Sequence, residues 1–537
     1  MPAMNLIDRA IATVAPLHAQ RRLLARASLT AFQALEPSVS PLNAPGLSGG
    51  GSTPARRTWF PRARDARADT LRDLPFNRAA SRELVRTSAI AAGAVQTNCD
   101  RVVGTGLALV SQPNRQVLGW SADQAAEWKA KTQAEFSLWS DSTDCDQEAT
   151  LNFYAKQNLQ LRAMLESGDC FTLLPAGKRT SSQPYALRLQ SIEADRVGAP
   201  GLSDWQKRDE AGGVRFDAAT GAPKAYHLYD DHPGAWYAGA GGYGKGVWVD
   251  RVGATGRLRM LHHFQKKRPG MVRGVPYLTP IVDCIKQITR YSEAEIMAAV
   301  ISAYLTVFIE TPGGDAAPVF AGDAVAVPDG GEIGLGQGAV VGLAPGEKPH
   351  TVNPSRPNPQ FAPFVDGVMT QIGMALGLPR ELLVKQFNSS YSASKAALLD
   401  AWVYIRGMRY WLAGSFCQPV YETWLAEAVA FGRIAAPGFF TDPLLRWAYT
   451  RAAWPGDSMG SINPKDEVEA YTRAIDARLM TREQAEWQLF GTDFNQTFDQ
   501  KADEIKRLAA ADMLPAAAPG AAAPQQTGAQ PPKEPQP

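Results

Sequence analysis

The stretch Met374–Trp402, MALGLPRELLVKQFNSSYSASKAALLDAW, decides the architecture of the C-terminal half of the chain. Residues 361–376, which lead into it, are predicted to be a helix. Gly377-Leu378-Pro379 predicts the end of that helix, because glycine favours the position after a helix and proline cannot continue one. RELLVKQFNSSYS then predicts a polar loop. A long aromatic-rich helix follows from about Ala393 to Ala430, and Pro419 should kink it.

The residues before this stretch predict another long helix, over 280–305, opened by a proline. Asp283, Lys286, Arg290 and Glu293 recur along it at intervals of three and four, which places them on one face. That face is either a solvated stripe or a contact surface between neighbouring copies. The segment 306–358, rich in proline and glycine among short apolar runs, predicts a small irregular β region between the two helices.

The N-terminal half predicts helices followed by strands. Helical spacing runs from Asn77 to Arg101 and from 123 to 167. Residues 170–264 change to short β-rich runs broken by glycine and proline, so the fold class is α+β. The side chains expected in the core are Leu84, Ala91, Val95, Cys99, Trp128, Phe136 and Trp139.

The ends of the chain differ in composition from its body. Residues 1–56 predict a basic amphipathic arm and a linker rich in Ser, Pro and Gly. Residues 461–508 predict capped helices, with Asn463-Pro464 and the capping box Thr481–Gln484 at their starts. Residues 509–537 have almost no bulky apolar side chain to bury, which predicts disorder.

The composition bounds the function only loosely. The chain has 537 residues, a net charge of +2 and 20% charged residues, which gives no support to a wholesale nucleic-acid coat. Its five cysteines are widely spaced and never form C-x-x-C pairs, which favours a reducing compartment over a zinc site. No run approaches the ~18 apolar residues of a membrane span, so a soluble intracellular protein without a membrane partner is expected.

No catalytic constellation stands out, and no metal or cofactor is expected. GAGGYGKG, residues 239–246, approaches a phosphate-binding loop, but Gly246 replaces the hydroxyl residue and a strand is predicted where a helix is required. His262 and His263 are adjacent on a predicted strand and point to opposite faces, so they cannot readily share one metal. Residues 230–234, DDHPG, are typical of a turn.

Several strings in order along the chain resemble the portal proteins of lambda-type tailed phages, from about Leu71 to Leu508. The first is the helix that ends in Asn98-Cys99-Asp100-Arg101-Val102-Val103-Gly104. Then follow GDCFTLLP, LQSIEADRV, FQKKRPGMVRGVPYLTPIV and LAPGEKP, the stretch quoted above, and INPKDEVEAYTRAIDARLMTREQAEWQLFGTDF. One departure is Ser392-Ala393-Ser394-Lys395, where the family more often has a serine pair and arginine after the tyrosine.

The resemblance implies a portal-protein fold built of named regions and assembled as a ring of about twelve copies. After the arm and linker, an α+β wing (57–279) leads into a stem helix (280–305), a β-rich clip (306–358) and a second stem helix (359–377). A tunnel loop (378–392), a long kinked wing helix with its following segment (393–460), a helical C-terminal crown (461–508) and the tail (509–537) complete the chain. We use "tunnel-loop segment" for residues 378–392.

The resemblance also implies a function: a non-enzymatic channel at the capsid vertex through which DNA is packaged and ejected. Its implied partners are the terminase large subunit, head–tail adaptors, capsid and scaffold proteins, and double-stranded DNA read without sequence specificity. Such a protein resides in the virion after assembly in the host cytoplasm. The alternatives are a nucleotide-binding packaging enzyme, which rests on GAGGYGKG alone, and a non-portal head or tail component.

Site residues follow from the same implication. The charged face Asp283, Lys286, Arg290 and Glu293 becomes a contact between ring subunits. The tunnel-loop segment and the start of the next helix offer cations and hydrogen-bond donors suited to transient contact with a phosphate backbone, and an ordinary solvated loop is the alternative. The residues expected to face DNA are Arg380, Lys385, Gln386, Asn388, Ser389, Ser390, Tyr391, Ser392 and Lys395.

Overall fold

The structure is a computed structural model. It describes residues 64–180, 183–199, 209–235, 246–303, 307–310, 348–351, 359–387, 390–458, 464–490, 494–511 and 513. The predictions for the arm and linker (1–56), for residues 239–245 of the glycine-rich stretch, for most of the β region (311–347) and for nearly all of the tail lie outside these residues. So do Asn388 and Ser389.

Two antiparallel sheets form the part of the chain that was predicted to be β-rich, residues 170–264. The first has the order β3 (Gln190–Ile192), β2 (Asp169–Leu173), β8 (Met260–Phe264). The second runs β4 (Glu210–Ala211), β5 (Val214–Phe216), β6 (Pro223–Tyr229), β7 (Gly246–Asp250). Apolar side chains of both sheets share one small core: Phe171, Ile192, Val214, Tyr226, Val249 and Met260.

Helices precede the sheets. After α3 (Ala66–Leu71), the single helix predicted over 77–101 is in fact two, α4 (Leu74–Thr87) and α5 (Ala89–Val102). The break falls at Ser88, whose backbone is extended and whose side chain accepts a hydrogen bond from the Ala91 N–H, a typical N-cap. The predicted helical region 123–167 contains α7 (Ala122–Ser140) and α8 (Phe153–Ser167), with the short α6 (Arg115–Leu118) before them.

The main core lies where these helices meet the long C-terminal helices. All seven side chains predicted from the N-terminal half are buried, and Phe136 packs edge-on against Trp424 with ring centroids 5.0 Å apart. The short strand β1 (Val110–Ser111) pairs with β11 (Ala452–Ala453), which joins the N-terminal helices to the segment that follows α14. The α+β class is therefore confirmed.

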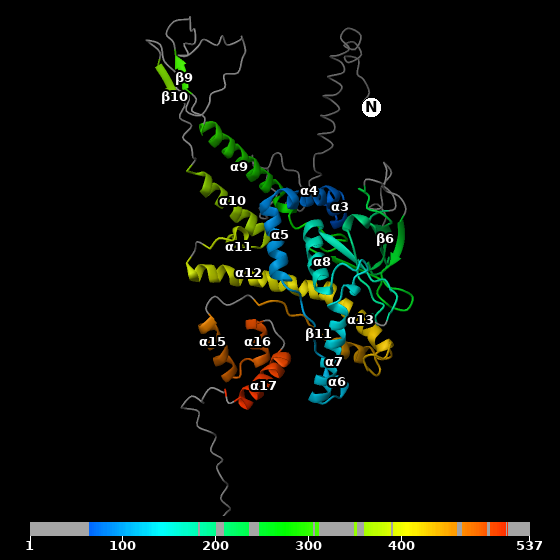
Figure 1. Ribbon diagram of the computed structural model, residues 1–537. Helices are drawn as coiled ribbons and strands as arrows, with labels where there is room; N and C mark the ends of the chain where they lie inside the picture. Colours follow the sequence, from blue (N-terminus) through cyan, green and yellow to red (C-terminus); the bar gives the residue numbers. More distant parts are fainter. Residues whose placement is uncertain are drawn as a thin grey trace, which may run out of the picture. The chain divides into compact units, whose positions relative to one another are not determined.

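Two long helices, which lie on either side of a pair of antiparallel strands in the sequence, lie side by side (Figure 1). They are α9 (Val282–Ala303) and α10 (Phe361–Leu376), and β9 (Val307–Glu310) pairs with β10 (Lys348–Thr351) between them in the chain. The first helix starts two residues after the predicted proline, because Pro280 belongs to a 3₁₀ turn, Thr279–Ile281. The second has the predicted bounds, and Gly377 ends it in a left-handed conformation.

The region after Gly377 differs from the prediction of a plain loop. It contains the helix α11 (Arg380–Val384), and α12 (Tyr391–Leu412) starts two residues earlier than expected, with Ser390 as its N-cap. A π-helical turn, Ala413–Cys417, separates α12 from α13 (Gln418–Ala430), so the expected irregularity lies just before Pro419. α14 (Pro443–Thr450) follows.

Three helices close the described chain: α15 (Pro464–Asp476), α16 (Arg482–Phe490) and α17 (Phe494–Ala510). The predicted capping box is confirmed, because Thr481 and Gln484 exchange hydrogen bonds at 3.1 Å in both directions. α17 continues two residues into the predicted tail. Among the described helices, none combines the length and the apolar composition needed to cross a lipid bilayer.

Candidate functional site

The tunnel-loop segment is anchored by a short helix that the sequence analysis treated as loop. Leu382 and Leu383 of α11 are buried in the main core, where α11 packs on α5. Lys385 ends this helix in a left-handed conformation, with φ of 54°, and its N–H donates to the Glu381 carbonyl. The N–H of Gln386 donates to the same carbonyl at 3.2 Å. The turn at Lys385–Gln386 is therefore held by α11 while both side chains are exposed.

Two of the predicted cations in this region have partners within the chain. Arg380 forms an ion pair with Asp366 of α10 at 2.6 Å, and Lys395 of α12 pairs with Glu467 of α15 at 3.3 Å. Ser390 caps α12 by accepting from the Ala393 N–H. Two predicted residues remain within the described part: Tyr391 is the first residue of α12, and Ser392, which follows it, is exposed.

The four charged residues predicted on one face of α9 are all exposed, and none makes a hydrogen bond or ion pair among the described residues. The same spacing of three and four continues to Met297 and Val300, which are 60% and 46% exposed. Ile285 and Ile288 lie on the opposite, buried face. We call Asp283, Lys286, Arg290, Glu293, Met297 and Val300 the α9 face.

A buried ionic cluster, which the sequence analysis missed, joins α4 to the first sheet. Asp169 at the start of β2 is fully buried and accepts from Arg78 at 2.6 Å and from Arg273 at 2.5 Å. His262 of β8 lies 3.1 Å from the same carboxylate. Arg273 also donates to the carbonyls of Ala194 and Val197, so its charge and hydrogen-bonding capacity are used.

The ionisation of this cluster follows from its contacts. Burial alone would raise the pKa of the Asp169 carboxyl, but Arg273 and Arg78 hold that pKa well below its usual range. Burial lowers the pKa of His262, against the opposing effect of Asp169. On the other face of β8, His263 bonds to Thr172 at 2.9 Å, and burial followed by the charge of His262 lowers its pKa to about 3. The predicted opposite orientation of the two histidines is confirmed.

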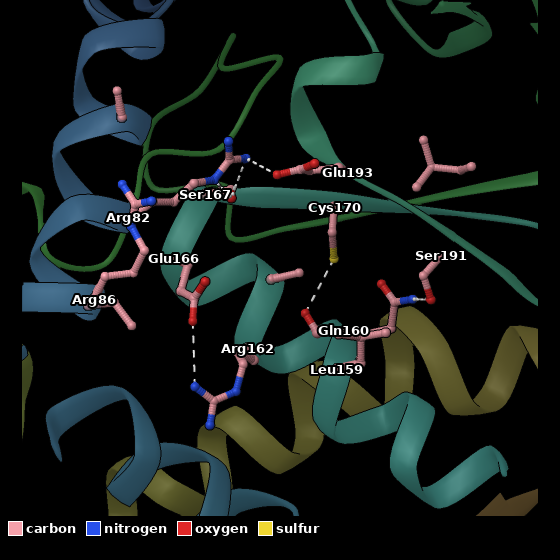
Figure 2. A pocket seen from close by; sticks show the side chains of 14 residues that line it. Arg82, Arg86, Leu159, Gln160, Arg162, Glu166, Ser167, Cys170, Ser191 and Glu193 are labelled. Atoms are coloured by element: carbon pink, nitrogen blue, oxygen red, sulfur yellow. Dashed lines mark hydrogen bonds and ion pairs between the residues drawn. The ribbon is translucent and has the colours of Figure 1, made fainter. Parts of the chain in front are cut away.

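A cavity of about 740 Å³ opens between α4 and α8 beside this cluster (Figure 2). Its walls are largely apolar, and Arg82, Arg86 and Arg162 lie at its side. Arg82 pairs with Glu193 at 3.0 Å and also with Asp195, and Arg162 pairs with Glu166 at 3.5 Å. These contacts fit a structural ion-pair network along the cavity wall.

One group of side chains near the cavity has the composition of a metal site: Glu193, Asp195 and His232. His232 Nε2 lies 3.5 Å from Glu193 and 3.6 Å from Asp195. However, His232 Nδ1 accepts a hydrogen bond from the Gly234 N–H, which leaves the proton on Nε2 and not a lone pair. Since Arg82 also contacts both carboxylates, the group fits the same ion-pair network better than a ligand set. His232 itself lies in residues 230–234, where the structure has the turn that the sequence predicts.

The comparison with protein families decides between the possible functions. Residues 52–409, two thirds of the chain, match the model of the phage portal protein, lambda family. The chain belongs to this family of portal proteins. The portal resemblance inferred from the ordered strings is therefore confirmed, and the chain functions as a phage portal protein.

Individual portal proteins show the same relationship along almost the whole chain. This chain is 22% identical to portal protein B of Escherichia phage lambda over 498 residues, which cover 88% of this chain and 91% of that protein. It is 23% identical to the portal protein of Escherichia phage N15 over 494 residues, 87% and 91% of the two chains. A solved chain from the neck of a native GTA particle, computed with C12 symmetry, is 13% identical, with a TM-score of 0.40, and covers 78% of this chain and 98% of its own.

The segment that suggested an NTPase fits this family assignment. Gly246, its last residue, opens the strand β7, whereas a phosphate-binding loop requires a helix at that point.

Proposed function

We propose that this portal protein forms a ring of about twelve copies at the capsid vertex and that double-stranded DNA passes through its channel. In this proposal the regions keep the wing, stem, clip and crown roles inferred above, and the ring docks the terminase large subunit, head–tail adaptors, capsid and scaffold proteins. Assembly takes place in the host cytoplasm, and the chain has no catalytic activity of its own. The family assignment supports the portal role.

The part of the proposal that concerns DNA rests on one observation: Lys385 and Gln386 are exposed on a turn that α11 holds against the core. A cation and an amide on a held turn can contact passing phosphates without ordering a flexible segment each time. Phosphate contacts carry no sequence information, which suits a channel that must pass any sequence.

Arg380 and Lys395 contribute less in this proposal than the sequence alone suggests. Their ion pairs with Asp366 and Glu467 offset part of their charge. We therefore propose Lys385 as the principal DNA-facing cation among the described residues, with Gln386, Ser390 and Ser392 as polar contacts. Asn388, Ser389 and Tyr391 complete the proposed set.

The test is Lys385→Glu, with Lys131→Glu as its matched control because Lys131 is an exposed cation on α7. Each change alters the charge by two per subunit, or by roughly 24 around a ring of twelve. We expect Lys385→Glu to leave ring assembly intact and to lower the yield of DNA-filled heads about tenfold, with partial recovery at higher salt because screening weakens phosphate repulsion. The Lys131 variant should package normally. Normal packaging by both variants at low and high salt would contradict the proposed DNA contact.

A further inference from the structure

The hydroxyl of Tyr277 lies at a point where four separate parts of the chain meet. Tyr277 belongs to the segment between β8 and α9, and its hydroxyl donates to the carbonyl of Leu376 at 2.5 Å. The Asn98 side chain of α5 donates to this hydroxyl at 3.2 Å. Tyr404 of α12 lies close enough to interact electrostatically with it. A tyrosine hydroxyl has one donor and two acceptor sites, so these two hydrogen bonds use the donor and one acceptor site.

The position of this hydroxyl matters because Leu376 is the last residue of α10 and precedes the tunnel-loop segment directly. The last four carbonyls of a helix have no partner within the helix, so Tyr277 supplies one that the helix itself cannot. Tyr404 lies on α12, which begins where the same segment ends. Tyr277 is bonded to the end of α10 and lies next to Tyr404 of α12, so these two neighbouring side chains connect the two helices that flank the segment.

Close packing at Gly377 reinforces this connection. Gly377 has a φ of +67°, and a Cβ on it would lie 3.3 Å from the ring of Tyr404. Gly373 is more tightly confined, since its Cβ would lie 2.6 Å from the carbonyl oxygen of Leu378. The backbone on both sides of the α10 end thus has little room to shift while the hydroxyl contacts are made.

We propose that Tyr277, together with Tyr404, is a positioning residue that fixes where the tunnel-loop segment leaves α10 and so where Lys385 stands. Its role is mechanical: it touches no DNA and acts through the backbone of Leu376. The expected effect on DNA packaging rests on the proposed function. The effect on the backbone of the tunnel-loop segment can be tested without DNA.

The test compares Tyr277→Phe and Tyr404→Phe with Tyr421→Phe in assembled full-length rings. Tyr421 is a fully buried tyrosine of α13, whereas Tyr277 and Tyr404 are half-buried, and its hydroxyl contacts Ser111 at 3.4 Å, away from the tunnel-loop segment. Each of the three changes removes one tyrosine hydroxyl and keeps the aromatic side chain. We measure hydrogen–deuterium exchange at the amides of residues 382–386, several of which donate to Pro379 and Glu381.

We expect about tenfold faster exchange of these amides in Tyr277→Phe, a smaller increase in Tyr404→Phe, which keeps the Leu376 bond, and no change in Tyr421→Phe. Unchanged exchange in both Tyr277→Phe and Tyr404→Phe would overturn the proposal. Equal increases in all three variants would also overturn it, since that result indicates general destabilisation. If Tyr277→Phe does not assemble, Tyr404→Phe against Tyr421→Phe decides.

DNA packaging by the same variants separates this inference from the proposed function. Loosened exchange with reduced packaging supports both. Loosened exchange with normal packaging, when Lys385→Glu also packages normally, supports the positioning role and contradicts the DNA contact.

Discussion

At the scale of single residues, Asp169 is the clearest determinant of stability. Replacing it with alanine leaves Arg78 and Arg273 buried without their shared anion, which should cost about 3–5 kcal/mol of unfolding free energy. Glu469→Ala, which breaks an exposed pair with Arg473, is the control and should cost less than about 0.5 kcal/mol. Chemical denaturation of the two variants measures the difference, and similar midpoints would contradict the role of the cluster.

The same residue predicts a pH dependence. Because the pKa of Asp169 is lower in the folded than in the unfolded chain, its stabilisation is complete above the unfolded value of about 4 and is lost as the pH falls towards the lowered value. Wild type should therefore lose stability below about pH 4 more steeply than Asp169→Ala. Parallel curves of melting temperature against pH would contradict this. The sequence could not reveal the cluster, because Arg78, Asp169 and Arg273 are far apart in the chain and only the fold brings them together.

At the scale of elements, the sequence predicts most helices and strands but not α11. α10 carries its own signals, an apolar periodicity and a terminal glycine, and its bounds are as predicted. α11 has only five residues, too few to be stable alone, and it exists because Leu382 and Leu383 are buried against α5. The signal that could have found it is the apolar run Leu382–Val384 inside a segment that otherwise looks polar.

This account of α11 predicts the effect of shortening its buried side chains. Leu382→Ala should destabilise the region by about 2–5 kcal/mol, the usual cost of such a cavity in a core. Exposed Leu399→Ala on α12 is the control and should cost much less. Native-state hydrogen exchange at residues 380–386 measures the effect locally. Equal protection in wild type and Leu382→Ala would mean that α11 is not held by this contact.

At the scale of the whole molecule, the α9 face is the surface for which a neighbouring copy in the proposed ring would account best. Its four charged residues, Asp283 to Glu293, carry both signs of charge and have no partners in the described chain. Nearer the end of the helix, Met297 and Val300 are exposed. A soluble monomer gains nothing from such a stripe, whereas a neighbouring copy would bury the apolar part and pair the charges. The sequence predicted the charged residues of this face, and the exposed Met297 and Val300 extend the face along the helix.

Met297→Asp tests this surface. Met297 is 60% exposed, so the change should alter the stability of the free subunit by only about 0.5 kcal/mol, but it places a charge in every subunit contact of the ring. In sedimentation velocity, we expect Met297→Asp to appear as free subunits and wild type to appear as rings. We expect the double variant Lys286→Glu, Arg290→Glu to weaken ring assembly mainly at low salt, where charge contacts are least screened. Leu138→Asp, which changes a 51% exposed leucine on α7, is the control for a surface charge outside the α9 face. Intact rings from Met297→Asp, with the melting temperature unchanged, would show that neighbouring subunits meet through a different surface.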